Sequence, residues 1–326
     1  MKAVRIHEDG GPEVLRYEDV PEPEPGPGEV LVDLRAASLN HLDVWVRKGL
    51  PSVPKPRILG ADGAGIVAGV GPGVEGFTVR DRVVINPGIE HGAVITVIGE
   101  HTDGTHCERI AVPATNVYPI AEGLSFEEAA AFPLVFETAY RMLVTKAHLQ
   151  PGEWVLVWGI GGGVGTASFE LARALGARTI VTSGSDEKLE RAREWGADVC
   201  VNHASGDVVA AAKEVGGVDL VVETVGEATW ARSLAAVKAG GRVTVCGATS
   251  GPNPPAQLHR FWWKQLTVYG STMGAREDFE GAYDLIRSGR ARVHVDSVLP
   301  LSEIRAAHER LEAGKQLGKI VLAVPG

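Results

Sequence analysis

The sequence has few cysteines and no long apolar run. Its 326 residues include three cysteines, Cys107, Cys200 and Cys246, which lie far apart in the chain. An odd number of widely spaced thiols does not make a disulfide framework and is typical of a reducing compartment. No segment approaches the roughly 18 apolar residues of a membrane-spanning helix, and the first residues contain no apolar signal-peptide core. We therefore expect a soluble cytoplasmic protein with no membrane partner.

Basic charge is also scarce. The chain has 41 acidic residues against 32 lysines and arginines, which gives a net charge of -9. Binding to nucleic acid requires a basic face, so we expect no nucleic-acid partner. Glycine, in contrast, is abundant at 41 residues, which predicts many tight turns or close backbone approaches.

Two regions with different patterns follow one another. Up to residue 122, short alternating segments such as "KAVRI" and "VLVDLRAAS" are separated by Gly- and Pro-rich links, a pattern typical of a twisted, barrel-like β-domain. From residue 123, where Ser125 and Glu128 form a helix-start pattern, six apolar strands alternate with amphipathic helices. This alternation predicts a parallel sheet covered on both faces. We assign residues 1–122 and 275–326 to the first domain and residues 123–274 to the second.

A glycine-rich turn opens the second region. In "VLVWGIGGGVGTASF", Gly159, Gly162 and Gly165 lie between a buried strand and an amphipathic helix. Glycines at such a turn let the backbone approach a pyrophosphate and direct free helix N–H groups at it. In a unit of six alternating strands, this pattern predicts a dinucleotide site. The predicted contacts in the turn are Gly159, Gly161, Gly162, Gly163, Val164 and Gly165.

The end of the next strand indicates which dinucleotide is bound. NAD sites carry an acidic residue there that accepts from the ribose 2′-OH, whereas here Asp186 comes later and could equally cap the next helix. Lys188 and Arg191 would suit the 2′-phosphate of NADPH, although such a pair more often forms a solvated helix face. We predict NADPH, with NADH as the alternative. The predicted contacts at this strand end are Ser183, Gly184, Ser185 and Lys188.

Two further strand ends complete the predicted cofactor site. Ligands of open parallel sheets bind at the carboxyl ends of the strands. The fourth and fifth strands end in "ETVG" and "CGATS". The predicted contacts there are Val225, Gly226, Cys246, Gly247, Ala248 and Thr249.

These segments, together with "ILGADGAGIVAGVGPGVEGF", "AAAFPLVFETAY" and the terminal "GKIVLAV", resemble the medium-chain dehydrogenase/reductase superfamily over essentially the whole chain. The resemblance implies a GroES-like β-rich catalytic domain built from both chain ends and a Rossmann domain between them. It also implies that Phe136 and Thr138 line the nicotinamide, although Phe136 could instead be a core residue. The segment "LTVYGSTMG" resembles the strand through which family members pair, so we expect a homodimer and leave a tetramer open.

The catalytic zinc ligands of the zinc alcohol dehydrogenases are replaced in this sequence. Where those enzymes carry a cysteine and a Gly-His-Glu triplet, this chain has Asn40 and "GAD", with Ala61 in place of the histidine. Amide and methyl groups supply neither thiolate nor imidazole. Leu42 stands where those dehydrogenases have a hydroxyl of the proton relay. The cysteine-rich lobe is also missing, so we predict no metal site and assign structural roles to the remaining histidines and Cys107.

The absent ligands make the chain similar to the zinc-free quinone oxidoreductase branch, which prefers NADPH and has a lysine at the position of Lys188. The resemblance implies hydride transfer to a quinone or an activated C=C bond, as in an enone or a 2-alkenal (an aldehyde). The alternatives are an alcohol dehydrogenase or carbonyl reductase, a 2-enoyl thioester reductase, and an NADPH-binding redox sensor with little turnover. A basic patch would favour thioesters that carry a nucleotide phosphate. The residues that could form it are Arg47, Lys48, Lys55 and Arg57.

Four polar residues of the first domain are the catalytic candidates. Asn40 could hydrogen-bond the substrate carbonyl or the nicotinamide ribose, or stabilise its own loop. His41 could contact the pyrophosphate, relay a proton, or pack in the protein. We expect Asp43 to hold the loop and Asp62 to orient His41 or to bind solvent. No residue stands out as an obligatory proton donor.

Overall fold

Strands from both ends of the chain form one unit, and the middle of the chain forms another. The computed structural model describes residues 1–92 and 94–325. Unit 1 consists of Met1–Leu134 and the chain from Val293 onward, and unit 2 of Val135–Arg292. The sequence led us to place these boundaries at residues 122 and 274 instead, so two helical segments belong to the other unit.

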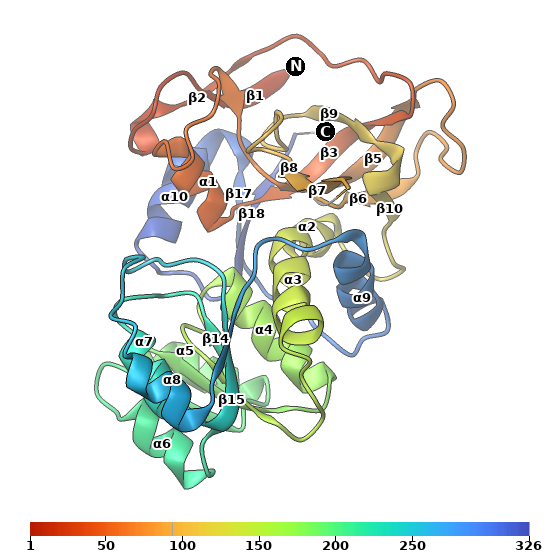
Figure 1. The fold of residues 1–326 in the computed structure, drawn as a ribbon. Coiled ribbons are helices and arrows are strands. Elements are labelled where there is room, and N and C mark those ends of the chain that lie inside the picture. Colours follow the sequence, from red (N-terminus) through yellow and green to blue (C-terminus); the bar gives the residue numbers. More distant parts are fainter. Residues whose placement is uncertain (93, 326) are drawn as a thin grey trace. The chain divides into compact units, whose positions relative to one another are not determined.

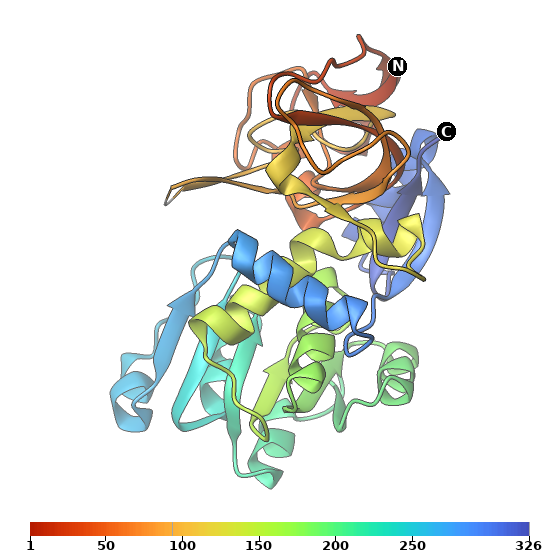
Figure 2. The ribbon, with the colours of Figure 1, turned by 90° about the vertical axis from the view of Figure 1, so that its right-hand side faces the viewer.

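Helix packing explains both differences. Helix α2 (Phe126–Ala131), which begins with the expected capping box of Ser125, packs on strands β3 and β5 of unit 1. Helix α9 (Arg276–Arg287) lies against α3 and α4 of unit 2 (Figure 2). Its Asp278 accepts from Nη1 of Arg141, which directly follows α3, at 3.0 Å. Each helix belongs to the unit that buries its apolar face, and the change in sequence pattern does not report this.

Unit 1 is built mainly from antiparallel strands. Its largest sheet has the order β10-β6-β5-β3-β18-β17, with β9 also paired to β3, so strands near the C-terminus extend a sheet begun near the N-terminus. The strands are β1 (Lys2–Ile6), β2 (Leu15–Asp19), β3 (Glu29–Ser38), β4 (Arg57–Ile58), β5 (Asp62–Val70), β6 (Arg82–Ile85), β7 (Gly88–His91), β8 (Val94–Val97), β9 (Arg109–Pro113), β10 (Val117–Pro119), β17 (Val295–Pro300) and β18 (Lys319–Ala323). The remaining helices are α1 (His41–Arg47), α10 (Ile304–Glu312) and the short 3-10 turns η1 (Pro12–Val14), η2 (Ala114–Asn116) and η4 (Leu301–Glu303).

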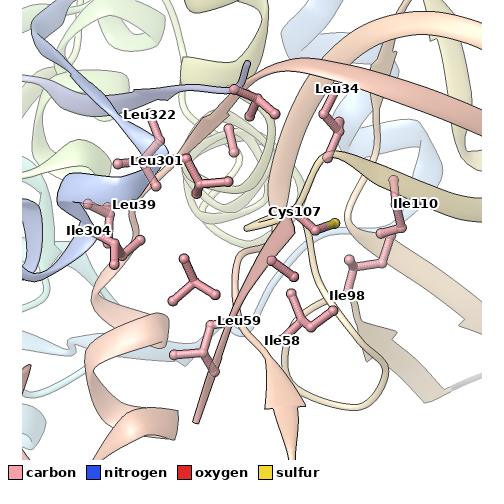
Figure 3. Close-up of a cluster of buried hydrophobic side chains, with 14 of the residues drawn as sticks. Leu34, Leu39, Ile58, Leu59, Ile98, Cys107, Ile110, Leu301, Ile304 and Leu322 are labelled. Carbon is pink, nitrogen blue, oxygen red and sulfur yellow. The ribbon is translucent and has the colours of Figure 1, made fainter. Parts of the chain in front are cut away.

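The core of unit 1 joins residues from both ends of the chain. Figure 3 shows Leu301, Ile304 and Leu322 beside Leu39, while Cys107 lies on the other side among aliphatic side chains. Burial raises the pKa of the Cys107 thiol to about 12, so this cysteine is a neutral core residue. His106 and Cys107 precede β9, which begins at Arg109, and both side chains are buried.

Unit 2 is a doubly wound parallel sheet. Its strand order is β13-β12-β11-β14-β15-β16, and every neighbouring pair is parallel. Figure 1 labels the neighbouring strands β14 and β15 of this sheet. Numbered from the first strand of the unit, this order is 3-2-1-4-5-6, that of the Rossmann fold. The strands are β11 (Trp154–Val157), β12 (Arg178–Ser183), β13 (Val199–Asn202), β14 (Val218–Glu223), β15 (Val237–Val245) and β16 (Thr267–Gly270). The helices are α3 (Pro133–Tyr140), the π-helix η3 (Arg141–Lys146), α4 (Gly163–Ala174), α5 (Asp186–Glu194), α6 (Val208–Glu214), α7 (Trp230–Ala236), α8 (Leu258–Lys264) and α9.

Two local features of unit 2 differ from the sequence pattern. Helix α7 ends at Ala236, and "VKAGG" begins strand β15 although its lysine and alanine are good helix formers. The aromatic helix α8 does not bury its tryptophans in the core: Trp262 is 64% exposed and Trp263 is 84% exposed. Within the part of the chain that the structure describes, no helix is long and apolar enough to cross a membrane.

Candidate functional site

The glycine turn joins β11 to α4 in unit 2. Gly159 has a φ of +68°, a left-handed conformation that side chains other than glycine rarely adopt. Its amide donates to Oγ1 of Thr182 at 3.1 Å, which ties the turn to the neighbouring strand β12. A Cβ atom at Gly165 would lie 2.5 Å from the carbonyl oxygen of Gly159, so the helix can pack this close to the turn only with glycine there.

Several amides of this turn lack an acceptor among the described residues. Gly162 is the N-cap of α4, and its own amide donates to the Gly159 carbonyl at 3.1 Å. No group in the described chain accepts from the amides of Gly161, Gly163 and Val164. Such unpaired donors at the positive end of a helix dipole are suited to the oxygens of a pyrophosphate. The turn therefore fits the dinucleotide that the sequence predicts.

The end of β12 is arranged differently from the sequence expectation. Ser185, and not Asp186, is the N-cap of α5, because its hydroxyl accepts from the amide of Lys188 at 3.4 Å. Asp186 instead accepts from Nδ2 of Asn202 at 2.7 Å. Arg191 forms an exposed ion pair at 3.3 Å with Glu194, so its charge is partly neutralised.

A histidine missed in the sequence lies at this strand end. Nδ1 of His203 is 3.3 Å from the hydroxyl of Thr182, and a Cβ atom at Gly184 would lie 3.4 Å from Nε2 of the same ring. Burial and the nearby Arg232 guanidinium lower the pKa of His203. The signal available in the sequence was its position directly after the third strand.

The predicted contacts after β14 and β15 lie on adjacent loops. The amide of Ser250 donates to the carbonyl of Val225 at 2.7 Å, and Gly226 and Gly247 have φ values of +92° and +96°. Burial raises the pKa of the Cys246 thiol to about 11, so this cysteine is neutral. The remaining predicted contacts of these loops, Ala248 and Thr249, follow Gly247 directly. Thr138 and Phe136 lie on α3, and each is 2% exposed.

In unit 1, Asn40 and Asp62 meet a lysine that the sequence analysis did not select. Nζ of Lys319 donates to Oδ1 of Asn40 at 2.6 Å and to Oδ2 of Asp62 at 3.0 Å. Nδ2 of Asn40 also donates to Oδ2 of Asp62 at 2.9 Å. All three residues are at most 4% exposed. We call Asn40, Asp62 and Lys319 the polar triad. Its signal in the sequence was a lysine that opens the otherwise apolar last strand.

Local backbone geometry holds the polar triad in place. Asn40 is the N-cap of α1, and its amide donates to Oδ2 of Asp43 at 2.7 Å. Oδ1 of Asp43 accepts from the amide of Gly60, at 3.0 Å, so Asp43 fixes the loop as expected. Asp62 also accepts from the hydroxyl of Ser38 at 3.1 Å. Burial raises the pKa of Asp43 to about 7, against the opposing effect of its two backbone donors and Lys319.

The two histidines near the polar triad are uncharged at neutral pH. Burial lowers the pKa of His41, and the ammonium of Lys319 acts in the same direction. Of the two roles considered for Asp62, orientation of His41 is not seen, since no hydrogen bond joins the two side chains in the described chain. Burial lowers the pKa of His106 to about 4, and its ring packs against Gly60.

The residues that stand where zinc alcohol dehydrogenases have their catalytic zinc ligands do not fit a zinc ion. Asn40 and Ala61 provide no thiolate or imidazole, and the carboxylate of Asp62 already binds the ammonium of Lys319. The positive charge of Lys319 at this point would repel a divalent cation. Over residues 1–92 and 94–325, no three or more His, Cys, Asp or Glu side chains come together in a way that could hold a metal ion.

The four basic residues that could have formed a phosphate-binding patch all have acidic partners. Arg47 is fully buried, and its Nη2 lies 2.8 Å from the carboxylate of Glu312, which also pairs with Lys48. The other ion pairs join Lys55 to Asp9 at 2.7 Å and Arg57 to Asp103 at 3.7 Å. The basic patch that would favour a nucleotide-bearing thioester is therefore not formed by these residues.

Comparison with known proteins agrees with this geometry. Residues 26–122 match the alcohol dehydrogenase GroES-like domain, and residues 163–288 match the zinc-binding dehydrogenase family. Human quinone oxidoreductase is 31% identical over 338 residues, covering 99% of this chain and 97% of that protein. The solved structure of an NAD-dependent alcohol dehydrogenase has a TM-score of 0.96 and 42% identity, covering 100% of both chains. A mycobacterial protein complexed with NADPH has a TM-score of 0.87 and 31% identity, covering 99% of this chain and 100% of that one.

These relatives and the Rossmann strand order define a nicotinamide-dependent oxidoreductase. The chain belongs to the medium-chain dehydrogenase/reductase superfamily. The family, the GroES-like domain and the enzyme class predicted from the sequence are confirmed.

Proposed function

We propose that the protein uses NADPH to reduce quinones or activated C=C bonds, such as those of enones and 2-alkenals, without a catalytic zinc ion. The polar triad carries this proposal, because it places an ammonium and an amide where a zinc enzyme requires metal ligands. Similarity to human quinone oxidoreductase supports the same reaction class.

Unit 2 would bind the cofactor. The unpaired amides of Gly161, Gly163 and Val164 would hold the pyrophosphate, and the small residues from Ser183 to Ser185 leave room for the ribose. We assign Lys188 to the 2′-phosphate, because an ammonium at the start of α5 offers charge-assisted hydrogen bonds to it. Similarity to a protein complexed with NADPH supports this choice.

Unit 1 would bind the electron acceptor. When bound, the cofactor supplies a hydride, and the acceptor gains negative charge on its carbonyl oxygen. An ammonium has three N–H donors, and Asn40 and Asp62 accept from two of those of Lys319 in the described chain. The third would donate to the acceptor oxygen and stabilise its charge. A proton from water would then complete the hydroquinone or the saturated ketone or aldehyde. Asp43 would hold Asn40 in register, and His41, which is neutral, would contact the pyrophosphate.

Turnover of three acceptors tests the proposal. Chelator-treated protein would be mixed with NADPH and a quinone, a cyclic enone or a saturated ketone, and loss of NADPH absorbance would be followed. We expect oxidation with the quinone or the enone and none with the ketone. Activity with the ketone alone, restored by added zinc, would instead indicate an alcohol dehydrogenase. Tight binding of NADPH with no turnover of any acceptor would favour the redox sensor.

A matched pair of lysine variants tests the cofactor preference. Lys188→Gln should weaken NADPH binding about tenfold, because one charge-assisted hydrogen bond to the 2′-phosphate is lost, and should leave NADH binding unchanged. Lys213→Gln, on the next helix, is the control and should change neither constant. Equal effects of Lys188→Gln on both cofactors would contradict the assignment.

We also propose that the protein forms a homodimer through strand β16. This strand is last in the sheet order, at the left margin of Figure 2, and Val268 within it is 37% exposed. An unpaired edge strand with apolar residues is suited to pairing with a second copy of itself. Sedimentation of the wild type should show a dimer, and Trp263→Lys on the neighbouring α8 should weaken it. A monomeric wild type would contradict the proposal.

A further inference from the structure

A buried carboxylate that no sequence motif marks ends strand β14. Glu223 is fully buried, and its Oε1 accepts from the amides of Val225 and Gly226 at 2.9 and 3.0 Å. The same oxygen accepts from the hydroxyl of Thr229 at 2.7 Å, and Oε2 accepts from that of Ser233 at 2.6 Å. Four donors therefore converge on one carboxylate, which matches its capacity as an acceptor of several hydrogen bonds.

These bonds hold the loop after β14 in one conformation. The two amides turn inward to Glu223, and Gly226 adopts a φ of +92°. A Cβ atom at Gly226 would lie 2.3 Å from the carbonyl oxygen of Gly251, so the loop is packed tightly against its neighbour. The Glu223 carboxylate thus fixes the orientation of the Val225 and Gly226 backbone amides.

The loop after β15 depends on the same arrangement. The amide of Cys246 donates to the backbone carbonyl of Glu223 at 3.0 Å. Further along, the amide and the hydroxyl of Ser250 both donate to the carbonyl of Val225 at 2.7 Å. These hydrogen bonds join the two loops to each other and to Glu223. Both loops contain predicted cofactor contacts.

Hydrogen bonds between side chains connect these two loops to the glycine turn. The hydroxyl of Ser233, which donates to Glu223, accepts from Nε1 of Trp158 at 2.8 Å. Trp158 is 1% exposed and lies between Gly159 and the end of β11, the strand that neighbours β14. Glu223 is therefore linked through a single hydroxyl to the residue that begins the turn.

We infer that Glu223 is the positioning residue of the nicotinamide-nucleotide site, holding the loops after β14 and β15 in register with the glycine turn. The inference rests on the proposed cofactor binding and names a residue that does not itself touch the cofactor. An amide cannot replace the carboxylate, because a glutamine would direct N–H groups at atoms that already donate. In Glu223→Gln, at least one loop amide or hydroxyl loses its acceptor, and the loops relax from the binding conformation.

Cofactor titration of purified protein tests this role. The dissociation constant of NADPH, measured from its fluorescence, should rise at least about tenfold in Glu223→Gln. The matched control is Asp219→Asn at the other end of the same strand, where the carboxylate accepts from the amide of Trp154 at 2.9 Å and pairs with Lys238. That variant should lose thermal stability yet keep its NADPH constant within about twofold.

A second variant keeps the test decisive if Glu223→Gln does not fold. Ser233→Ala removes only the bridging hydroxyl, and it should also raise the NADPH constant. In the Glu223→Gln and Ser233→Ala double variant, the losses should be less than additive, because both changes break one network. Wild-type affinity in Ser233→Ala and in any folded Glu223→Gln, or an equal loss in Asp219→Asn, would overturn the inference while leaving cofactor binding intact. A wild type that binds neither NADPH nor NADH would instead overturn the proposed function, and the inference with it.

Discussion

Replacing Lys319 by methionine removes the only cation of the polar triad. In the wild type its ammonium lies 2.6 Å from the Asn40 oxygen and 3.0 Å from the Asp62 carboxylate, and both members of the ion pair are at most 5% exposed. Removing one partner of a buried ion pair costs about 3–5 kcal/mol, because the other charge stays buried without compensation. Asp62 retains donors from Ser38, Asn40 and the amide of Leu134, so we expect a loss near the lower end, about 3 kcal/mol.

Urea unfolding followed by circular dichroism measures this loss. Lys315→Met is the matched control, because Lys315 lies on the same segment and is exposed, and it should change the free energy of unfolding by less than about 0.5 kcal/mol. Adding Asp62→Asn to Lys319→Met should restore part of the stability, since the unpaired charge is then gone. A Lys319→Met protein as stable as Lys315→Met would refute the claim that the triad is a buried, coupled group.

Three further outcomes follow from local geometry. Gly165→Ala should raise the NADPH dissociation constant at least about tenfold, because the added Cβ would lie 2.5 Å from a backbone oxygen. Gly69→Ala is the control, since the nearest atom to its added Cβ lies at 3.9 Å. Equal NADPH dissociation constants of the two variants would contradict the assigned role of Gly165. His106 titrates near 4 in the folded protein and near 6.5 when unfolded, so unfolding binds a proton between these values and stability falls as the pH drops through that window. The free energies of unfolding of wild type and His106→Gln, measured with urea at several pH values, should diverge by about 3 kcal/mol between pH 7 and pH 4, and parallel pH profiles would contradict this prediction. Ser125→Ala should lower the free energy of unfolding by about 1 kcal/mol, through loss of the capping bond to Glu128, and an unchanged thermal midpoint would argue against it.

Features that depend on neighbouring residues were predicted well. The glycine turn, the capping box of Ser125 and the six strands of the parallel sheet all arise from patterns within a few residues. Their physical causes, such as a required positive φ or an unsatisfied helix amide, are local and can be recognised in a sequence.

The helix boundaries and caps show where local patterns are insufficient. Asp186 and Ser185 are both good N-cap residues, and in the structure Ser185 caps α5 while Asp186 accepts a hydrogen bond from Asn202. The amphipathic pattern of α9 predicts a helix without indicating which unit buries it. The exposed tryptophans of α8 have the composition of a core segment but lie on the surface.

The sequence by itself determined the family, the six alternating strands and helices of unit 2 and the position of the cofactor turn, because these follow from contiguous motifs and from local periodicity. Only the tertiary structure decided which polar side chains meet. Lys319 reaches Asn40 across 279 positions of the chain, because β18 pairs with β3. Glu223 reaches Ser233 and, through it, Trp158 because β14 neighbours β11 and α7 packs on β14. Such contacts depend on which strands become neighbours and which charges are buried together, and no local pattern encodes either.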